Sequence, residues 1–337
     1  MRRTIETKLE GIGRRESVFG PRFVGLMRSA GATLGTGAVA SAAGVGLAHL
    51  ETRFPLVRHY DVPVAARPDL EETRILHISD LHIFSRQTHL VEFLHKVAAE
   101  EEFDLVISTG DNLGGNDGYA LLLKALRPLM KKPGAFVLGS NDYYSPLSKP
   151  WIAYLDPRHH EKAADHHLDS PDLPWLDLVR EMTSAGWLDL SNQSGHLEVP
   201  VGGDVQPVDV ALVGVDDPHI RRDRMPALDQ QWMNPSALRL ALTHSPYRRV
   251  LNEFTRDGAD LILAGHTHGG QIRLPGVGAI VNNCDIPRKY SRGLTTWEYG
   301  DSRSQMHISA GLGTSRNAQI RLFCRPEVSI LRVCPTA

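Results

Sequence analysis

Side chains that can bind metal ions follow several short apolar runs of the sequence. They are Asp80, His82, Asp111, Asn141, His244, His266 and His268. A short apolar run bounded by turn residues is typical of a buried strand, so each of these side chains is expected where a strand ends. Imidazole and carboxylate groups are the mixed nitrogen and oxygen ligands that divalent Zn, Mn or Fe accept, and no thiolate belongs to the set. We therefore expect two divalent metal ions (Mn, Fe or Zn) on rigid elements.

The spacing of these residues indicates hydrolytic chemistry. In Asp80-Leu-His82 and in His266-Thr-His268 the polar side chains are two residues apart just beyond a strand, so both members of a pair point the same way. Asp111 ends another apolar run, and a carboxylate there can bridge two ions about 3.5 to 4 Å apart. Such a pair lowers the pKa of a bridging water and neutralises charge that develops on a phosphoryl group. The pattern therefore favours hydrolysis over a structural zinc or iron–sulfur site.

Strands that alternate with helices are expected to position these ligands. Apolar runs of strand length lie at 74–79, 105–108, 135–138, 208–215, 238–243 and 261–264, and helical patterns lie at 89–100 and 119–129. This alternation predicts an α/β architecture. Later runs at 279–281, 293–299, 306–309 and 328–333 read as strands without long helices between them. They predict a second, more antiparallel sheet, packed on the first with helices outside.

The order of the motifs carries a family resemblance. The chain reads Asp-x-His, Gly-Asp, Gly-x-Asn-Asp, a single His before Ser-Pro, and Gly-His-x-His, each after an apolar run. Over residues 74–333 these motifs resemble the calcineurin-like metallophosphoesterase superfamily, and 264–271 is especially similar to its small bacterial phosphodiesterase members. The resemblance implies an α/β fold, a four-layer α/β/β/α sandwich of two mixed sheets flanked by helices. It also implies one metal on Asp80, His82 and His268, a second on Asn141, His244 and His266, and Asp111 bridging them.

One motif departs from that superfamily. The family usually has Gly-Asn-His-Asp/Glu, in which Asn binds metal and His contacts the phosphate and can protonate the leaving oxygen, whereas residues 139–142 read Gly-Ser-Asn-Asp. A gapless match places Ser140 at the ligand position, and a shift of one residue keeps Asn141 there. We favour Asn141, because an amide oxygen is the better neutral donor.

The departure also removes a histidine that acts as a general acid, typically worth about 10² to 10⁴ in rate. A good leaving group tolerates this loss. His219, Tyr143 or a histidine of an insertion loop at 143–174, which is rich in Pro, His and Asp, could take its place. Asp111, Asn141 and Asp142 are the residues expected to carry catalysis, with Asp142 able to orient a neighbouring ligand instead.

The first 50 residues differ from the rest of the chain. Residues 1–28 carry seven basic and three acidic side chains, and residues 29–50 contain no Asp, Glu, Lys or Arg. A basic flank before about twenty uncharged residues suits a transmembrane or signal helix. We expect residues 1–50 to be the leader of a membrane-anchored or exported bacterial protein. The alternative is a cytoplasmic protein in which these residues form an Ala-rich soluble helix or a disordered leader. Prolines after residue 51 predict a linker at 51–70 and a folded domain at 71–337.

Composition and motifs together define the expected function. The chain is 42% apolar with a net charge of −2, which favours a globular protein with a small substrate over a nucleic-acid partner. We expect a metal-dependent phosphohydrolase, in the first place a phosphodiesterase that uses a bridging hydroxide for in-line attack on phosphorus. Its partner is a phosphoester small molecule or a lipid head group, with membrane association through residues 29–50. The alternative is a metal-binding scaffold or phospho-ligand sensor with weak or no catalysis, because the usual histidine is missing.

Overall fold

The computed structural model describes residues 44, 46–65, 70–146, 170–202 and 206–336. The chain divides into two units, residues 1–46 and residues 47–337, and every element named below lies in the second. Most of the expected leader and most of the expected insertion loop lie outside the described residues. Within the described part, no helix combines the length and apolarity needed to cross a bilayer.

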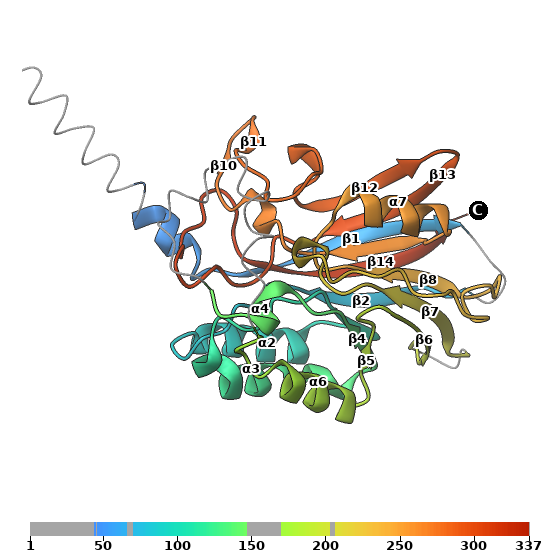
Figure 1. Ribbon diagram of the computed structural model, residues 1–337, viewed down its shortest axis with the longest axis horizontal. Coiled ribbons are helices and arrows are strands. Elements are labelled where there is room, and N and C mark those ends of the chain that lie inside the picture. The colour runs from blue at the N-terminus through green and yellow to red at the C-terminus, as the bar shows by residue number, and fades with distance from the viewer. Residues whose placement is uncertain (1–43, 45, 66–69, 147–169, 203–205, 337) are drawn as a thin grey trace, which may run out of the picture. The chain divides into compact units, whose positions relative to one another are not determined.

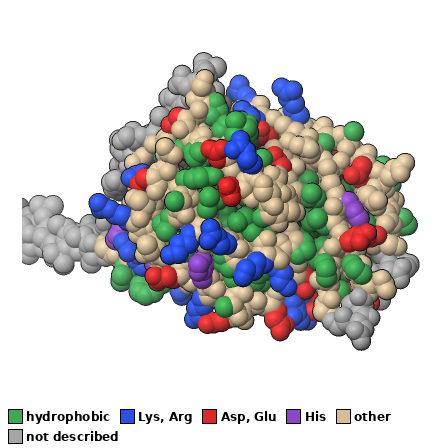
Figure 2. All heavy atoms as spheres, turned by 90° about the horizontal axis from the view of Figure 1, so that it is seen from below, with side chains coloured by type: hydrophobic (Ala, Val, Ile, Leu, Met, Phe, Trp, Pro, Cys, Tyr) green, Lys and Arg blue, Asp and Glu red, His purple; other side chains and the backbone are tan. Residues whose placement is uncertain are grey.

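The first sheet carries the strands that precede three of the candidate ligand motifs. Its order is β1 (Leu56–Ala65), β14 (Glu327–Thr336), β2 (Thr73–Ile78), β3 (Leu105–Ser108), β4 (Gly134–Phe136) and β5 (Leu188–Asp189). Only the β14–β2 pair is antiparallel. The helices α2 (Thr88–Glu100), α3 (Tyr119–Leu126) and α6 (Trp175–Ser184) cover its outer face (Figure 1). Basic and acidic side chains are interspersed on the surface seen from that side (Figure 2), so neither sign dominates it.

The second sheet carries the remaining ligand motifs. Its order is β12 (Gly293–Tyr299), β13 (Ser302–Ile308), β9 (Leu261–Ala264), β8 (Leu238–Leu242), β7 (Val208–Gly214) and β6 (Gln193–Val199). The two edge pairs are antiparallel and the inner pairs are parallel. The helix α7 (Arg248–Arg256) packs on its outer face.

Shorter elements connect these layers. The helix α4 (Ser140–Tyr143) follows β4, and β10 (Arg273–Leu274) pairs with β11 (Gly278–Ala279) in a two-stranded ribbon. Among the described residues, five 3-10 helices lie at Asn116–Gly118, Leu129–Lys131, Pro218–Ile220, His268–Gly270 and Arg288–Tyr290.

Three apolar interfaces separate the four layers. Successive side chains of a strand face opposite sides, so Leu76 of β2 belongs to the apolar cluster that includes Leu94 of α2, whereas Ile75 belongs to the cluster that includes Leu240 of the second sheet. The third interface joins the outer face of the second sheet to α7. The four-layer α/β/β/α sandwich expected from the sequence is confirmed.

The strands at 74–79, 105–108, 135–138, 208–215, 238–243 and 261–264 appear as β2, β3, β4, β7, β8 and β9. Their assignment to sheets was less accurate. β14 returns to the first sheet between β1 and β2, whereas β7, β8 and β9 join the later strands in the second sheet. An apolar run that is buried on both faces shows that a strand is present, but it does not show which strand pairs with it in the sheet. The sequence therefore predicted the strands correctly and their grouping into sheets incorrectly.

The structure corrects the linker predicted at 51–70. Leu56–Ala65 forms β1, which runs parallel to β14 at the edge of the first sheet. An edge strand tolerates Pro63 because its missing N–H removes no bond from an inner ladder. Val62 and Val64 are buried in the core between the sheets, and their alternation with exposed residues is the signal that the prolines obscured.

Two buried histidines meet between the sheets. His77 of β2 and His307 of β13 lie with their Nδ1 atoms 2.8 Å apart, and His77 Nε2 lies 3.0 Å from Thr109 Oγ1. Burial lowers the pKa of both rings, that of His77 well below its usual range and that of His307 to about 3. Both imidazoles are therefore neutral in the folded protein at pH 7.

Stability should consequently fall as the pH falls. An unfolded chain protonates histidine near about pH 6.5, while folded His307 stays neutral to about pH 3, so acid favours the unfolded state between these values. We expect the free energy of unfolding of His307→Gln to depend less steeply on pH than that of the wild type, by about 1.4 kcal/mol per pH unit near pH 5. Urea unfolding over a pH series measures both slopes. Exposed His95→Gln is the control, and parallel profiles for wild type and His307→Gln would contradict the prediction.

Candidate metal centre

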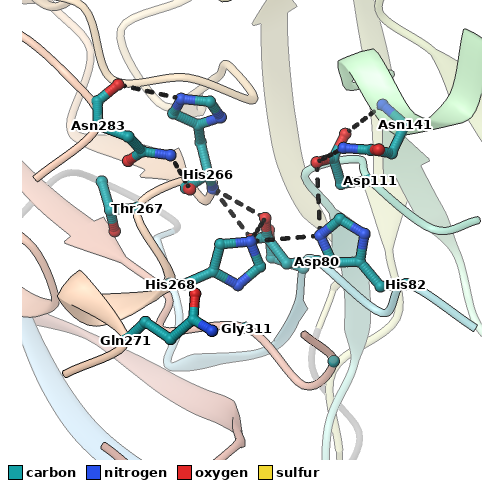
Figure 3. Close-up of polar contacts among 12 residues, drawn as sticks. Asp80, His82, Asp111, Asn141, His266, Thr267, His268, Gln271, Asn283 and Gly311 are labelled. Atoms are coloured by element: carbon teal, nitrogen blue, oxygen red, sulfur yellow. Dashed lines mark hydrogen bonds and ion pairs between the residues drawn. The ribbon is translucent and has the colours of Figure 1, made fainter. Parts of the chain in front are cut away.

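The parallel strands of both sheets end at one edge of the sandwich, and the predicted ligands meet there. Asp80 and His82 follow β2, Asp111 follows β3, Asn141 lies in α4 after β4, His244 follows β8, and His266 and His268 follow β9. Figure 3 shows side chains from both sheets pointing toward one another. All seven predicted residues are linked by the distances given below.

The backbone at these positions has an unusual conformation. Among the described residues, nine that are not glycine have a positive φ, and they include Asp80 (49°), His82 (40°), Asp111 (54°), His266 (67°) and His268 (49°). A left-handed conformation is unfavourable for residues with a Cβ, and it persists where the surrounding structure enforces it. The chain thus turns sharply after β2, β3 and β9, which directs these side chains into the common space.

One group of donor atoms comes from Asp80, His82 and His268. His268 Nε2 lies 3.6 Å from Asp80 Oδ1 and 3.3 Å from His82 Nε2. Ligands about 2.1 Å from a shared ion lie about 3.0 to 3.4 Å from one another in octahedral or tetrahedral geometry. The spacing of these atoms fits a divalent cation better than a set of ordinary hydrogen bonds.

Asp111 lies between this group and a second one. Its Oδ2 is 3.5 Å from His82 Nε2, and its Oδ1 is 3.4 Å from His244 Nε2. Asp80, Asp111 and His244 together form another cluster of donor atoms within 4.8 Å of one another. The two oxygens of one carboxylate therefore face two different imidazoles, which is the arrangement required for a bridging ligand.

Asn141 rather than Ser140 contacts this carboxylate. The backbone N and the Nδ2 of Asn141 each donate to an oxygen of Asp111 at 2.7 Å, whereas Ser140 Oγ lies 3.4 Å from Asn141 Nδ2. A half-turn of the amide exchanges its oxygen and nitrogen, so Asn141 can offer an oxygen ligand at the same place.

Hydrogen bonds fix which nitrogen of two histidines faces the site. His244 Nδ1 lies 2.6 Å from the carbonyl oxygen of Thr109, which leaves Nε2 toward Asp111. His266 Nε2 lies 3.3 Å from the carbonyl oxygen of Asn283, and His266 Nδ1 is 3.3 Å from His244 Nε2. Carbonyl partners of this kind orient imidazoles that bind metals.

Burial sets the charge of the cluster. It lowers the pKa of His82, His266 and His268, which keeps these rings in the neutral form that can bind a cation. Burial alone would also lower the pKa of His244, but the charge of Asp111 raises it well above its usual value. Burial opposes ionisation of Asp111, yet His244 holds the pKa of Asp111 well below its usual range. The centre therefore combines the ionised carboxylate of Asp111 and the protonated ring of His244 with the neutral imidazoles of His82, His266 and His268.

Asp142 is placed to orient the loops rather than to face the donor atoms. Its carboxylate is fully buried and accepts the backbone N–H groups of Asp111, Asn112 and Gly139, each at 2.9 Å. Burial raises the pKa of Asp142 to about 7. The contacts tie the loop after β3 to the loop after β4, so Asp142 acts through the residues it positions.

The residues that could replace the missing histidine differ in their position relative to the candidate metal centre. Tyr143 is buried and its hydroxyl donates to Asp216 at 3.0 Å, and burial raises the pKa of Tyr143 above its usual value. His219 lies beside the centre, with its ring centroid 4.4 Å from that of His266 and its Nδ1 3.0 Å from Tyr247 Oη. The histidines of 147–169 lie outside the described residues.

Sequence reasoning missed two residues that support the site from behind. Gly311 has a φ of +74°, and a Cβ on it would lie 2.6 Å from the Cβ of Asp80. Arg321 is fully buried, and its Nη2 donates to the carbonyl oxygens of Ala310, Gly311 and Gly313 at 2.8, 3.1 and 2.6 Å. The Gly-Leu-Gly run at 311–313 was the only sequence signal of this close approach.

Comparison with known proteins identifies the family whose sequences this chain matches. A model of the calcineurin-like phosphoesterase family matches residues 73–270. The uncharacterized metallophosphoesterase YkoQ of Bacillus subtilis is 27% identical over 79% of this chain and 85% of its own length. Phosphodiesterase YaeI of Escherichia coli is 27% identical over 88% of this chain and 94% of its own length. The structure of phosphopantetheinyl hydrolase from Mycobacterium tuberculosis aligns at 12% identity over 77% of this chain and 95% of that chain, with a TM-score of 0.37.

The close approach of Gly311 to Asp80 gives a prediction with a matched control. Gly276 has nearly the same φ, +76°, but a Cβ there meets nothing within 4 Å. Alanine at either position should destabilise the fold by about 1 to 2 kcal/mol, because its Cβ disfavours this backbone conformation, and Gly311→Ala should cost more because its Cβ also meets Asp80. Only Gly311→Ala should also displace Asp80 and weaken binding of Mn²⁺, by about ten- to a hundredfold. Calorimetric titration measures the affinity, and equal affinities in the two variants would exclude this role of Gly311.

Proposed function

Because the chain belongs to the calcineurin-like phosphoesterase family and is a metal-dependent phosphoric ester hydrolase, we propose that it cleaves phosphodiesters at a binuclear centre. One centre would use Asp80, His82 and His268, the other Asn141, His244 and His266, with Asp111 shared. The observation that carries the proposal is the position of Asp111 between His82 and His244.

The donor set fits two divalent ions (Mn, Fe or Zn) by its chemistry. Imidazoles, carboxylates and an amide are ligands that these ions accept in common. Bound ions would supply positive charge for the phosphoryl oxygens and would lower the pKa of water at the site. The chain itself would hold the phosphodiester so that water attacks phosphorus from the side opposite the leaving oxygen, whose bond to phosphorus breaks.

Two features favour a phosphodiester with a good leaving group. The relative YaeI is named a phosphodiesterase. Residues 139–142 also lack the histidine that can protonate the leaving oxygen in the calcineurin-like metallophosphoesterase superfamily. Its absence should slow the cleavage of substrates whose leaving group needs a proton. A phosphoester small molecule or a lipid head group is therefore the proposed substrate. An exported or membrane-anchored location through residues 29–50 stays a prediction from the sequence.

His219 is the residue best placed to hydrogen-bond a phosphoryl oxygen in place of the missing histidine. It comes from the loop after β7 and its ring packs on His266. Asp217 accepts the backbone N–H of His219 at 2.9 Å and the Ser245 hydroxyl at 2.7 Å, which fixes this loop next to His244. The ring is thus held from both its backbone and its Nδ1 side.

Replacement of Asp111 by Asn tests the shared carboxylate. The amide keeps the shape of the side chain but removes the charge between His82 and His244. We expect kcat/KM for bis(p-nitrophenyl) phosphate with Mn²⁺ to fall by about 10² to 10³ or more. Asp177→Asn on the exposed face of α6 is the control. Equal, metal-dependent turnover by wild type and Asp111→Asn would exclude the bridging role, and lack of turnover by the wild type on phosphodiesters would favour a metal-binding scaffold.

Replacement of His219 by Asn tests the proposed contact with substrate. Loss of one hydrogen bond to a charged oxygen should lower kcat/KM by about 10- to 100-fold while the metal content stays unchanged. Tyr247→Phe removes only the partner of His219 Nδ1 and should have a smaller effect. Elemental analysis alongside steady-state kinetics separates this result from metal loss. Full activity of His219→Asn would refute the assignment.

A further inference from the structure

A second concave site lies beside the metal centre at the same edge of the sandwich. This pocket has a volume of about 580 Å³ and is lined from residues 52–53, 84–90 and 312–319. Its wall at Gly313 touches the chain that carries two candidate ligands. Gly313 N donates to Asp80 O at 2.7 Å, and a Cβ on Gly313 would lie 2.9 Å from His82 Cβ. The loop at 311–313 therefore contacts both the pocket and the segment that carries Asp80 and His82.

The charge of the pocket is positive. Arg53, Arg86, Arg316 and His89 line it, and no Asp or Glu does. Arg316 is neutralised by Asp117, with Nη1 2.7 Å from Oδ1. Arg53 and Arg86 form no ion pair with any residue that the structure describes. Two guanidinium groups, which match phosphate in shape and charge, are thus left without an acidic partner at the rim.

A helix terminus and a buried amide add donors to the same pocket. The helix α2 begins at Thr88 with no acidic residue in its first turn and no side-chain cap from Gln87. The first N–H groups of a helix carry partial positive charge and favour anions. Gln87 lines the pocket with 8% of its surface exposed. Its Oε1 accepts from Phe84 N at 3.0 Å, and its Nε2 has no partner among the described residues.

We propose that this pocket binds a second phosphate group of the same substrate molecule whose phosphoester bond is cleaved at the metal centre. The assignment rests on the proposed function for the scissile group, and it narrows the substrate class to compounds with two separated phosphates. Arg53 and Arg86, the α2 terminus and the amide of Gln87 would bind the remote phosphate. The same chemistry is offered by a soluble phosphorylated metabolite and by a phosphorylated lipid head group.

Alkane bisphosphonates of increasing chain length test this proposal on the full chain with Mn²⁺. One phosphonate occupies the metal centre, and at a suitable length the other reaches the pocket. The second contact is then intramolecular and should tighten binding by about tenfold or more over the matching monophosphonate. Isothermal titration measures both affinities without relying on turnover. A bisphosphonate advantage therefore supports the pocket even if bis(p-nitrophenyl) phosphate is not hydrolysed.

The double variant Arg53→Gln/Arg86→Gln should lose this advantage while binding of the monophosphonate stays unchanged. The matched control is Arg180→Gln/Arg256→Gln, which removes two exposed arginines from α6 and α7. The absence of an advantage at every chain length, or an equal advantage in the two double variants, would overturn the proposal.

Competition with natural head groups separates the two sources of substrate. Displacement of the best bisphosphonate by soluble glycerophosphoinositol 4-phosphate would assign a soluble ligand. Displacement only by phosphatidylinositol 4-phosphate in phosphatidylcholine vesicles would assign a lipid. Displacement by neither would count against a second phosphate.

Discussion

The site depends on sharp left-handed turns where the strands β2, β3 and β9 end. Asp80, Asp111 and His266 hold positive φ angles that a residue with a Cβ avoids, at about 1 to 2 kcal/mol for each. The three apolar interfaces of the sandwich hold these turns in place, because the strands that precede them are buried on both faces. The packing of the layers thus stabilises the unfavourable backbone conformation and fixes the direction in which each of these side chains points.

Two buried side chains complete this restraint through hydrogen bonds to the backbone of the loops. Asp142 accepts backbone N–H groups from the loops after β3 and β4, and Arg321 donates to the carbonyl groups of 310–313. Burial of a charge is unfavourable unless hydrogen bonds replace water, and here the backbone supplies them. Each loop is therefore fixed by a partner that would itself be destabilised if the loop moved.

The sequence was sufficient for features that local patterns encode. Runs such as 105–108 and 261–264 appear as β3 and β9 with the same bounds, and the ligand motifs follow such strands. It was insufficient where a contact is distant along the chain. The place of β14 between β1 and β2, and the approach of Gly311 to Asp80, depend on pairings of residues more than 200 positions apart. Residue types alone specify neither, because the partner is chosen by the packing of the sheets.

The altered motif at 139–142 shows why such packing matters for chemistry. In this chain the residue after Asn141 is used to hold two loops together, and Tyr143 is bound to Asp216 in the segment that also carries Asp217 and His219. The loops after β4 and β7 are therefore tied across the two sheets. Because strands of both sheets end at the same edge, a donor lost from the first sheet can be supplied from the second, and His219 already packs on His266 there. The fold thus fixes the position of a phosphate contact at this edge, whereas the strand that provides the contact can differ.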